Sequence, residues 1–371
     1  MFHHPNSSRT QSISPDRTLS TADYGWDDER ERSFVGLRAD GLIPGRVVRT
    51  DRGRCDIVTD AGPVRASVRP PSNADDGRTS STGDWVALSP ATADAPAVVE
   101  EVLDRRTVVV RATASRTSHG QVLAANVDTV AVVVSLSDRV RPGRIERLLT
   151  LAWESGATPV VVLTKGDLCA DTALALAEVT EVTPGVQVIL TSASHGNGLD
   201  ELVEALTGTI VLLGPSGVGK STLGNRLLGE DLLATGAVRD SDGKGRHTTA
   251  WRELLPLPHG GVLLDTPGLR GIGIPGADDG LDRTFAEFTE LAQACRFADC
   301  AHVAEPGCAV LAAVEAGDIT RRRVDNFHRL QRENAHAQAR TDARLRAELE
   351  RSRKEISRHI RALKRSPNFK S

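Results

Sequence analysis

The sequence has few cysteines and no long apolar run, and each of these two shortages excludes a class of protein. No run of about 18 apolar residues exists among the 371 residues, so no membrane-spanning helix is expected. Aromatic residues make up only 3% of the chain, which by itself excludes no class. The opening segment "MFHHPNSSRTQSISPDRTLS" has no apolar stretch of the kind found in secretory signals, which makes the cytoplasm the expected location. Five cysteines are too few and too clustered to form a disulfide framework.

The positive charge is concentrated at the C-terminal end. Residues 320–371 contain sixteen Lys and Arg against six Asp and Glu, in a chain whose net charge is −3. An excess of this kind favours a polyanionic partner, and nucleic acid is the obvious one. A solvated helix crossed by ion pairs is the alternative interpretation of the same residues.

Short alternating apolar runs between residues 42 and 103 predict a small β-barrel. The segment "GRVVRTDRGRCDIVTDAGPVRASV" is typical of this stretch, where Gly and Asp turns separate five or so strands. An OB-fold is the favoured type, and such barrels commonly bind nucleic acid. Because this stretch carries little surplus positive charge, a purely structural barrel is the alternative. Residues 1–36 are polar and without periodicity, so we expect a disordered leader.

Near-continuous runs of β-branched and other apolar residues follow the barrel region. They are "TVAVVVSLSD", "PVVVLTKGDL", "VQVILTSAS", "TIVLLGPSG" and "GVLLDTPGL", and segments of helical period such as "RIERLLTLAWES" separate the first three. Strands buried on both faces and alternating with helices are typical of a parallel α/β sheet. Ligands of such sheets bind at the carboxyl ends of the strands, where the polar and glycine-rich residues of these runs fall.

The segment "GPSGVGKS", from Gly214 to Ser221, matches the phosphate-binding loop G-x-x-x-x-G-K-[ST]. Its glycines allow backbone N–H groups to surround phosphates, Lys220 neutralises their charge, and the Ser221 hydroxyl is suited to Mg²⁺. The helix that begins with "STLGNRLLG" directs its positive end at the same anion. Because an apolar strand precedes the loop and a helix follows it, the sequence predicts a nucleotide site.

Further motifs complete this site. In "LLDTPGLR", Asp265 is placed to hold Mg²⁺ through water and the Gly268 N–H to sense the γ-phosphate. In "GKGRHTTAW", either Thr248 or Thr249 is expected to complete the Mg²⁺ shell, and Thr249 is favoured.

The choice of base comes from "TKGD". The carboxylate of Asp167 is able to accept two hydrogen bonds from guanine, which adenine does not match, and the stem of Lys165 covers the base. Thr164 stands where Asn is more usual, so one contact to the base edge is expected to be weaker. In "TSAS", the Ala193 N–H is expected on guanine O6, with Ser192 shaping the turn. The predicted nucleotide contacts are Thr164, Lys165, Gly166, Asp167, Ser192, Ala193, Gly214, Pro215, Ser216, Gly217, Val218, Gly219, Lys220, Ser221, Thr222, Thr249, Asp265 and Gly268.

The order of these motifs is inverted, because the guanine-reading loop precedes the phosphate loop. Starting at the phosphate loop, the strands run "TIVLLGPSG", "WRELLPLP" and "GVLLDTPG", and then continue at "TVAVVVSLSD", "VVVLTKGD" and "VQVILTSAS". This series makes a complete six-stranded GTPase sheet whose chain begins halfway through. Chain termini commonly lie at the surface and close together, so circular permutation is physically tolerable.

Three cysteines and a histidine lie within fourteen residues in "CRFADCAHVAEPGC". Cys295, Cys300, His302 and Cys308 form a C-x₄-C-x-H-x₅-C pattern, whose three thiolates and one imidazole fit a closed tetrahedral Zn²⁺ shell. No ligand position remains for a reacting water, so the site is expected to be structural and to contribute to folding.

Together these segments resemble the ribosome small-subunit-dependent GTPase A family. The resemblance covers about residues 40–330 and rests on "QVLAANVDTV", "TKGD", "TSA", "GPSGVGKSTL", "GRHTT", "DTPG" and the cysteine cluster. It implies an N-terminal OB-fold, a circularly permuted GTPase domain and a C-terminal zinc domain. It also implies hydrolysis of GTP to GDP with Mg²⁺, stimulated by the 30S subunit through 16S rRNA, in late 30S maturation. We expect a monomer with a leader over 1–36, an OB-fold over 37–110, a GTPase domain over 111–275 and a helical zinc domain with a basic tail over 276–371.

The residue that orients the attacking water does not follow from the usual GTPase motif. GTPases that use glutamine carry it just after the D-x-x-G glycine, but Leu269 stands there and an apolar side chain cannot polarise water. The resemblance implies that the histidine of "GRHTT", His247, takes this role as catalytic residue. A loop histidine that contacts rRNA or solvent is the alternative. Two other functions also fit the motifs: an rRNA-binding assembly chaperone with GTP as a structural ligand, and a permuted GTPase of large-subunit assembly.

Overall fold

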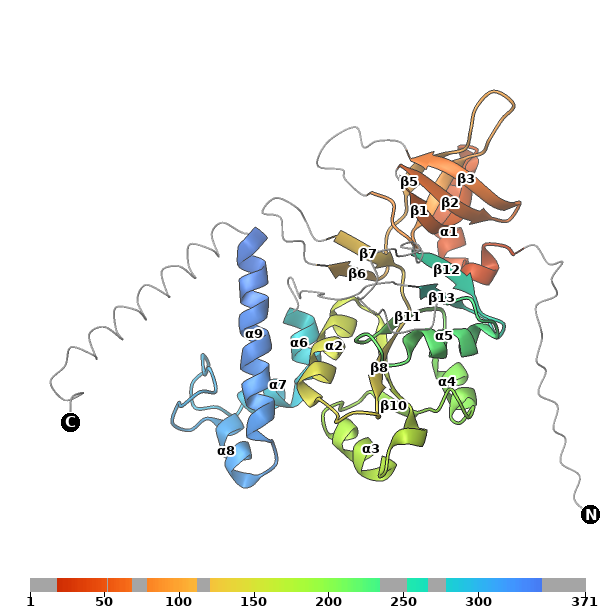
Figure 1. The fold of residues 1–371 in the computed structure, drawn as a ribbon. Coiled ribbons are helices and arrows are strands. Elements are labelled where there is room, and N and C mark those ends of the chain that lie inside the picture. Colours follow the sequence, from red (N-terminus) through yellow and green to blue (C-terminus); the bar gives the residue numbers. More distant parts are fainter. Residues whose placement is uncertain are drawn as a thin grey trace, which may run out of the picture. The chain divides into compact units, whose positions relative to one another are not determined.

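The computed structural model describes residues 19–51, 53–68, 79–111, 121–233, 252–265 and 278–341. The chain divides into two compact units, of which the first comprises Met1–Val110 and Val122–Arg270. The second comprises Arg111–Gln121 and Gly271–Ser371. The first unit contains a closed barrel and a six-stranded sheet, whereas helices dominate the second (Figure 1).

The N-terminal part of the first unit is a closed five-stranded barrel. Its strands are β1 (Ile43–Asp51), β2 (Arg54–Thr59), β3 (Gly62–Val68), β4 (Trp85–Ser89) and β5 (Val98–Val102), in the order β1-β2-β3-β5-β4. The β1–β4 pair closes the barrel, and β3 and β5 run parallel while the other neighbours are antiparallel. This arrangement confirms the predicted OB-like barrel. Alternating strand residues fill its centre together with Ala97, which directly precedes β5: Val47, Cys55, Ile57, Ala66, Val86, Leu88, Ala97 and Val99.

A helix precedes the barrel where the sequence predicted a disordered leader. That prediction is wrong from residue 19 onward, because η1 (Ala22–Tyr24) and α1 (Asp28–Ala39) are both formed, and residues 1–18 lie outside the described part. The Asp27 side chain caps α1 by accepting a hydrogen bond from the Arg30 N–H at 2.9 Å. The Phe34 side chain is fully buried, and the ring of Trp26 lies 5.6 Å from that of Phe34 and 4.9 Å from that of Trp85. Packing of three aromatic rings therefore holds a helix that the polar sequence did not indicate.

The six predicted sheet strands form one sheet in the order β10-β9-β8-β11-β13-β12. They are β8 (Thr129–Ser135), β9 (Thr158–Thr164), β10 (Gln187–Leu190), β11 (Thr209–Leu213), β12 (Glu253–Pro256) and β13 (Val262–Asp265). All neighbours are parallel except the edge strand β12, which pairs antiparallel with β13. The sheet is complete only when the chain is followed from β11 to β13 and then from β8 to β10, which confirms the permuted α/β fold. A separate two-stranded sheet joins β6 (Val108–Arg111) and β7 (Gln121–Ala125).

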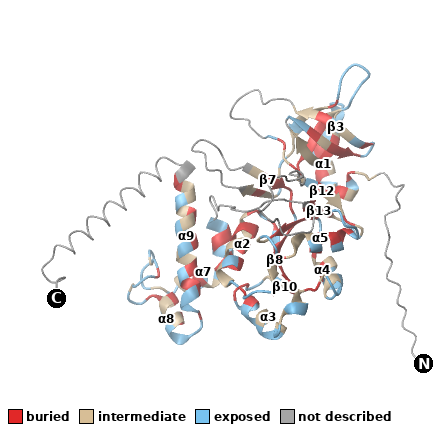
Figure 2. Ribbon diagram, viewed as in Figure 1, coloured by how far each residue is buried: buried red, intermediate tan, exposed pale blue. Residues whose placement is uncertain are grey.

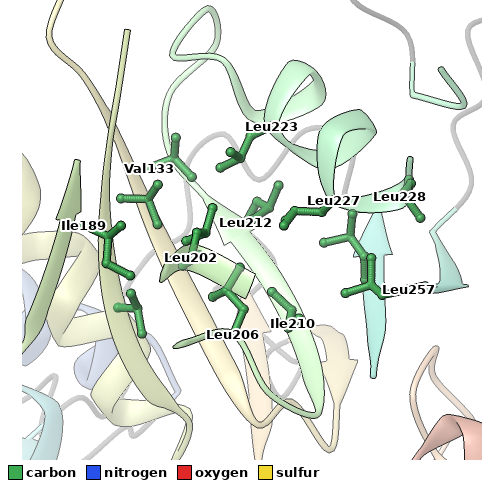
Figure 3. Close-up of a cluster of buried hydrophobic side chains, with 14 of the residues drawn as sticks. Val133, Ile189, Leu202, Leu206, Ile210, Leu212, Leu223, Leu227, Leu228 and Leu257 are labelled. Atoms are coloured by element: carbon green, nitrogen blue, oxygen red, sulfur yellow. The ribbon is translucent and has the colours of Figure 1, made fainter. Parts of the chain in front are cut away.

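Helices cover both faces of this sheet. The helices α2 (Pro142–Glu154) and α3 (Thr172–Glu181) connect β8 to β9 and β9 to β10. Both connections run the same way across the sheet, so right-handed crossovers place both helices on one face. The opposite face carries α4 (Leu199–Ala205) and α5 (Lys220–Leu228), whose leucines pack on strand residues such as Val133 and Ile210 (Figure 3). Strands that are buried on both faces account for the unbroken apolar runs in the sequence.

A buried polar network joins the barrel to the sheet within the first unit. Arg46 of β1 is 2% exposed, and its guanidinium donates to Thr209 Oγ1 at 3.0 Å and to the Asn126 carbonyl at 3.2 Å. It lies over the Trp85 ring, 4.7 Å from the centroid, and burial lowers the pKa of Arg46 to about 9. Arg30 of α1 donates to Asn126 Oδ1 at 3.1 Å. Thr209 begins β11, and the phosphate loop follows the carboxyl end of that strand. The barrel is therefore bonded to the amino end of β11, away from the nucleotide loops.

The second unit contains α6 (Asp278–Thr284), α7 (Ala286–Ala292), α8 (Ala309–Ala316) and α9 (Arg321–Thr341). The rings of Phe285, Phe288 and Phe327 form its aromatic cluster, with centroids 5.1–5.5 Å apart. Figure 2 shows buried residues along one side of α9 and exposed residues along the other. Within the described ranges, none of the helices has the length and apolar character needed to cross a membrane.

Candidate nucleotide site and metal centre

The predicted phosphate loop connects the end of β11 to the first residue of α5. Lys220 begins that helix, and its ammonium donates to the carbonyls of Gly214 at 2.9 Å and Pro215 at 2.8 Å. A Cβ on Gly214 would lie 2.6 Å from the Val133 carbonyl oxygen, so only glycine fits there. Gly219 caps the helix with a φ of 97°, a left-handed conformation. The loop thus leads into the N-terminus of α5, where the positive end of the helix dipole favours an anion.

The predicted base-reading loop is tied to the phosphate loop by two side chains. Thr164 ends β9 and is 3% exposed, and its hydroxyl donates to the Val218 carbonyl at 2.6 Å. The Lys165 ammonium donates to the Gly217 carbonyl at 2.9 Å. Two loops some fifty residues apart in the chain are therefore joined beyond the carboxyl ends of β9 and β11. The Thr164 hydroxyl is engaged with the phosphate loop, so contact of this residue with guanine stays a prediction.

Asp167 projects from the same loop toward the turn that follows β10. The Ser192 hydroxyl donates to Asp167 Oδ1 at 2.5 Å, and Oδ2 lies 3.9 Å from His195 Nδ1. The hydrogen bond from Ser192 is the main cause that holds the pKa of Asp167 below its ordinary value. The carboxylate is therefore ionised at neutral pH and retains lone pairs for two further donors.

The turn after β10 is held by residues that sequence reasoning missed. Arg226 of α5 donates from Nε to the Ala193 carbonyl at 2.9 Å, which links the phosphate-loop helix to the predicted guanine O6 contact. His195 Nδ1 lies 3.2 Å from Ser192 Oγ and 3.1 Å from Ser194 Oγ. These contacts join residues distant in the sequence or within a short turn, so no periodicity or motif reveals them.

Other predicted nucleotide contacts lie at the same edge or outside the described residues. Asp265 ends β13, which is parallel to β11, so its backbone stands beside the strand that leads into the phosphate loop. Ser221 is half-buried in the first turn of α5, and Thr222 beside it is exposed. The following predicted residues lie outside the described ranges: His247, Thr248, Thr249, Gly268 and Leu269.

The structure brings together the four predicted metal ligands of the second unit. The ligand atoms of Cys295, Cys300, His302 and Cys308 all lie within 4.8 Å of one another. Cys295 Sγ is 3.7 Å from His302 Nδ1 and 3.9 Å from Cys308 Sγ, and His302 Nδ1 is 3.3 Å from Cys308 Sγ. Zinc bonds to sulfur of about 2.3 Å and to nitrogen of about 2.0 Å give tetrahedron edges of about 3.5 to 3.8 Å. The donor set and its spacing thus fit one zinc ion.

Backbone and helix contacts support this cluster. Cys308 caps α8, its sulfur accepting from the Leu311 N–H at 3.4 Å, and the Ala309 N–H points at Cys295 Sγ at 3.3 Å. N–H groups and the positive end of a helix stabilise thiolates, which are the form that binds zinc. His328 of α9 lies with Nε2 3.3 Å from the His302 carbonyl, a contact that the sequence did not indicate.

Comparison with known proteins identifies the family. A family model described as RsgA GTPase matches residues 102–275. The "Small ribosomal subunit biogenesis GTPase RsgA" of Streptomyces coelicolor is 53% identical over 353 residues, which cover 94% of this chain and 94% of the relative. The chain belongs to the RsgA GTPase family. The protein of the same name from Streptomyces avermitilis is 54% identical, and the match covers 88% of this chain and 89% of the relative.

Solved structures agree with this RsgA assignment. "YjeQ from Thermotoga maritima" is 28% identical with a TM-score of 0.60, and the match covers 78% of this chain and 97% of that chain. A structure described as "YloQ, a circularly permuted GTPase" is 24% identical with a TM-score of 0.58 over 79% of this chain and 94% of that chain, a likeness of fold alone. The predicted family, fold class and GTP hydrolase activity are therefore confirmed.

Proposed function

We propose that this RsgA family member hydrolyses GTP to GDP in the late maturation of the small ribosomal subunit, and that the 30S subunit stimulates the reaction. The names of the Streptomyces relatives support the biological role. The chemistry is supported by one observation above all: Thr164 and Lys165 bond the Asp167 loop to the carbonyls of the phosphate loop. A base reader and a phosphate cradle held at a fixed separation are what a guanine nucleotide requires.

In this proposal Asp167 accepts the two ring and amino hydrogens of guanine, while the Ala193 N–H donates to its O6. Ser192 holds the Asp167 carboxylate, and Arg226 holds the peptide of Ala193 from the carbonyl side. The stem of Lys165 covers the base. Both contacts that read the base are thus braced by neighbours before the nucleotide binds, which lowers the ordering cost of binding.

The phosphates lie at the N-terminus of α5 in the proposal. Lys220 exchanges its bonds to the loop carbonyls for the β- and γ-phosphates, and the N–H groups of the loop surround the same oxygens. Ser221 and Thr249 are the proposed protein ligands of Mg²⁺, with Asp265 acting through water. The ion would neutralise phosphate charge as the γ-phosphoryl leaves. The Gly268 N–H is the proposed sensor of the γ-phosphate.

His247 is the proposed residue that orients the attacking water. Leu269 offers no polar group at the position where many GTPases carry glutamine, so a group from another loop has to supply the contact. A neutral imidazole is able to accept a hydrogen bond from water and is ordinarily unprotonated at cytoplasmic pH. Binding to the 30S subunit orders this loop in the proposal, so turnover without the subunit is slow.

The second unit is the proposed contact with 16S rRNA. One structural zinc ion on the Cys295, Cys300, His302 and Cys308 cluster holds its loop, and the net charge of +10 over residues 320–371 attracts RNA phosphates. The protein acts in the cytoplasm as a monomer in this proposal.

The experiment that tests the proposed function is single-turnover hydrolysis of GTP by wild type and His247→Ala, with and without purified 30S subunits.

The proposal predicts that 30S subunits accelerate wild-type hydrolysis and that His247→Ala removes most of this acceleration while GTP still binds. Acceleration without dependence on His247 would refute the proposed role of that residue alone. Unchanged slow turnover of the wild type on saturating 30S would instead indicate an assembly chaperone that uses GTP as a structural ligand, and would refute the proposed function.

A further inference from the structure

Phe297 is the aromatic side chain that the described part of the chain leaves exposed. It is 41% exposed, and it lies on the metal-binding loop between Cys295 and Cys300. Val303, directly after the ligand His302, is 57% exposed. Single exposed apolar residues are ordinary on protein surfaces. Two on one short loop that also carries four metal ligands indicate a surface built for contact rather than packing.

The metal-binding loop that carries Phe297 is held by hydrogen bonds from its backbone to the Glu305 side chain. The Glu305 carboxylate accepts hydrogen bonds from the N–H groups of Ala301, Val303 and Ala304 at 2.8–3.1 Å. These bonds, that of Val303 first, lower the pKa of Glu305 to about 2. With the metal ligands beside it, the ring is presented on a preorganised support. A partner that binds it therefore loses little affinity to ordering of this loop.

Arg296 places a planar cation over the face of the Phe297 ring. Its guanidinium carbon lies 5.5 Å from the centroid of Phe297. Its N–H donates to the Gly307 carbonyl at 3.0 Å, and a Cβ on Gly307 would lie 3.0 Å from the Arg296 Cβ. The absence of a side chain at Gly307 thus leaves room for Arg296 beside Phe297. Phenyl rings and guanidinium groups are the protein surfaces on which unpaired nucleotide bases stack.

The helix that touches this loop carries cations on the same side. His328 of α9 contacts the loop at the His302 carbonyl. Arg321 and Arg332 stand seven residues before and four residues after His328, so the 3.6-residue period places all three along one side of the helix. Both arginines are exposed. The ion pair of Arg321 with Asp325, at 3.3 Å, is on the surface and is weak enough to exchange for a phosphate.

We propose that Phe297 and Arg296 form a stacking platform for an unpaired base of structured RNA, while Arg321 and Arg332 contact the phosphates of the same strand. The proposal rests on the proposed function, because the 30S subunit supplies the RNA. It assigns to the metal-binding loop a contact that the cysteine pattern alone does not indicate. A zinc ion bound by the four ligand residues would therefore also hold Phe297 and Arg296 in position.

Charge favours RNA over a protein pocket as the occupant. An apolar pocket on a protein would accept Phe297 and Val303 but would gain nothing from a guanidinium held beside the ring. An RNA loop uses the ring, the guanidinium and the arginines of α9 together. The two occupants also differ in what they require at position 297. A base requires a flat ring, whereas a pocket requires apolar volume.

The experiment measures binding of full-length protein to purified 30S subunits in the presence of a non-hydrolysable GTP analogue. The variants are Phe297→Ala, Phe297→Leu and Phe297→Tyr, and the matched control is Val35→Ala, an exposed apolar residue of α1 in the first unit. Zinc content and thermal unfolding show that each variant is folded. A parallel series varies the salt concentration for wild type, Phe297→Ala and Arg332→Gln.

The platform predicts that Phe297→Ala and Phe297→Leu both weaken 30S binding about 5- to 150-fold, while Phe297→Tyr and Val35→Ala bind like wild type. Arg332→Gln lowers the salt dependence by about one phosphate contact, and Phe297→Ala leaves it unchanged. Wild-type binding by Phe297→Leu beside weak binding by Phe297→Ala would mean a protein pocket and overturn the proposal. Wild-type binding by both would also overturn it. Failure of the wild type itself to bind 30S subunits would refute the proposed function instead.

Discussion

Replacing Asp167 by Asn tests which residue reads the base. The substitution exchanges one carboxylate oxygen for an amide nitrogen and removes the negative charge. The local structure has little reason to change, because the Ser192 hydroxyl that now donates to Oδ1 at 2.5 Å is equally able to accept from an amide. The effect therefore falls on the nucleotide and not on the fold.

The magnitude follows from the two hydrogen bonds that the carboxylate offers to guanine. Hydrogen bonds to a charged acceptor are stronger than neutral ones, so loss of the pair is expected to lower the affinity for GDP by about 10²- to 10⁴-fold. Xanthine carries a carbonyl where guanine carries its amino group, so the new amide donates to it and affinity for XDP rises. The pKa of Asp167 lies below its ordinary value, so the wild-type carboxylate is charged throughout the neutral range.

The assay is calorimetric or fluorescence titration of wild type and Asp167→Asn with GDP and XDP. Asp200→Asn, an exposed carboxylate in the first turn of α4, is the matched control and is expected to bind GDP like wild type. A variant that keeps wild-type preference for GDP over XDP would refute the assignment of the base reader.

Three further predictions follow from the contacts of the site. Thr164→Val removes the buried hydroxyl that donates to the Val218 carbonyl, so the free energy of unfolding is expected to fall by about 1 to 3 kcal/mol and the affinity for GDP to fall with it. Thr164→Ser keeps a hydroxyl and is expected to restore both. Equal stability of the two variants in denaturant titration would contradict this. Gly214→Ala drives a methyl into the Val133 carbonyl at 2.6 Å and is expected to abolish nucleotide binding, and normal GDP titration would count against the loop geometry. Cys308→Ser is expected to release the zinc ion and unfold the second unit while GDP affinity stays unchanged, and retention of one zinc per chain in metal analysis would contradict the assignment.

Much of the fold was predictable because its signals are local. The buried strands of the sheet are apolar over their whole length, as in "TVAVVVS" of β8 and "TIVLL" of β11, and their loops carry motifs whose chemistry demands fixed spacing. The clustering of the four predicted metal ligands was predictable for the same reason, since three cysteines and a histidine within fourteen residues are able to converge on one point.

The remaining features depend on contacts between distant segments, which no window of sequence contains. The helix α1 is polar and is stabilised by packing of Phe34 against Trp26, so the predicted disorder was wrong there. The role of Thr164 as a bond to the phosphate loop depends on two strands being neighbours in the sheet. Arg226 contacts the Ala193 carbonyl only because α5 passes beside the turn after β10.

The central claim is that this protein is a GTPase coupled to the small ribosomal subunit. The most direct measurement compares steady-state GTP hydrolysis by the full-length protein alone, with purified 30S subunits and with purified 50S subunits at equal concentration. The account predicts a strong increase in kcat with 30S subunits and none with 50S subunits. Equal stimulation by both, or stimulation by 50S subunits alone, would contradict it.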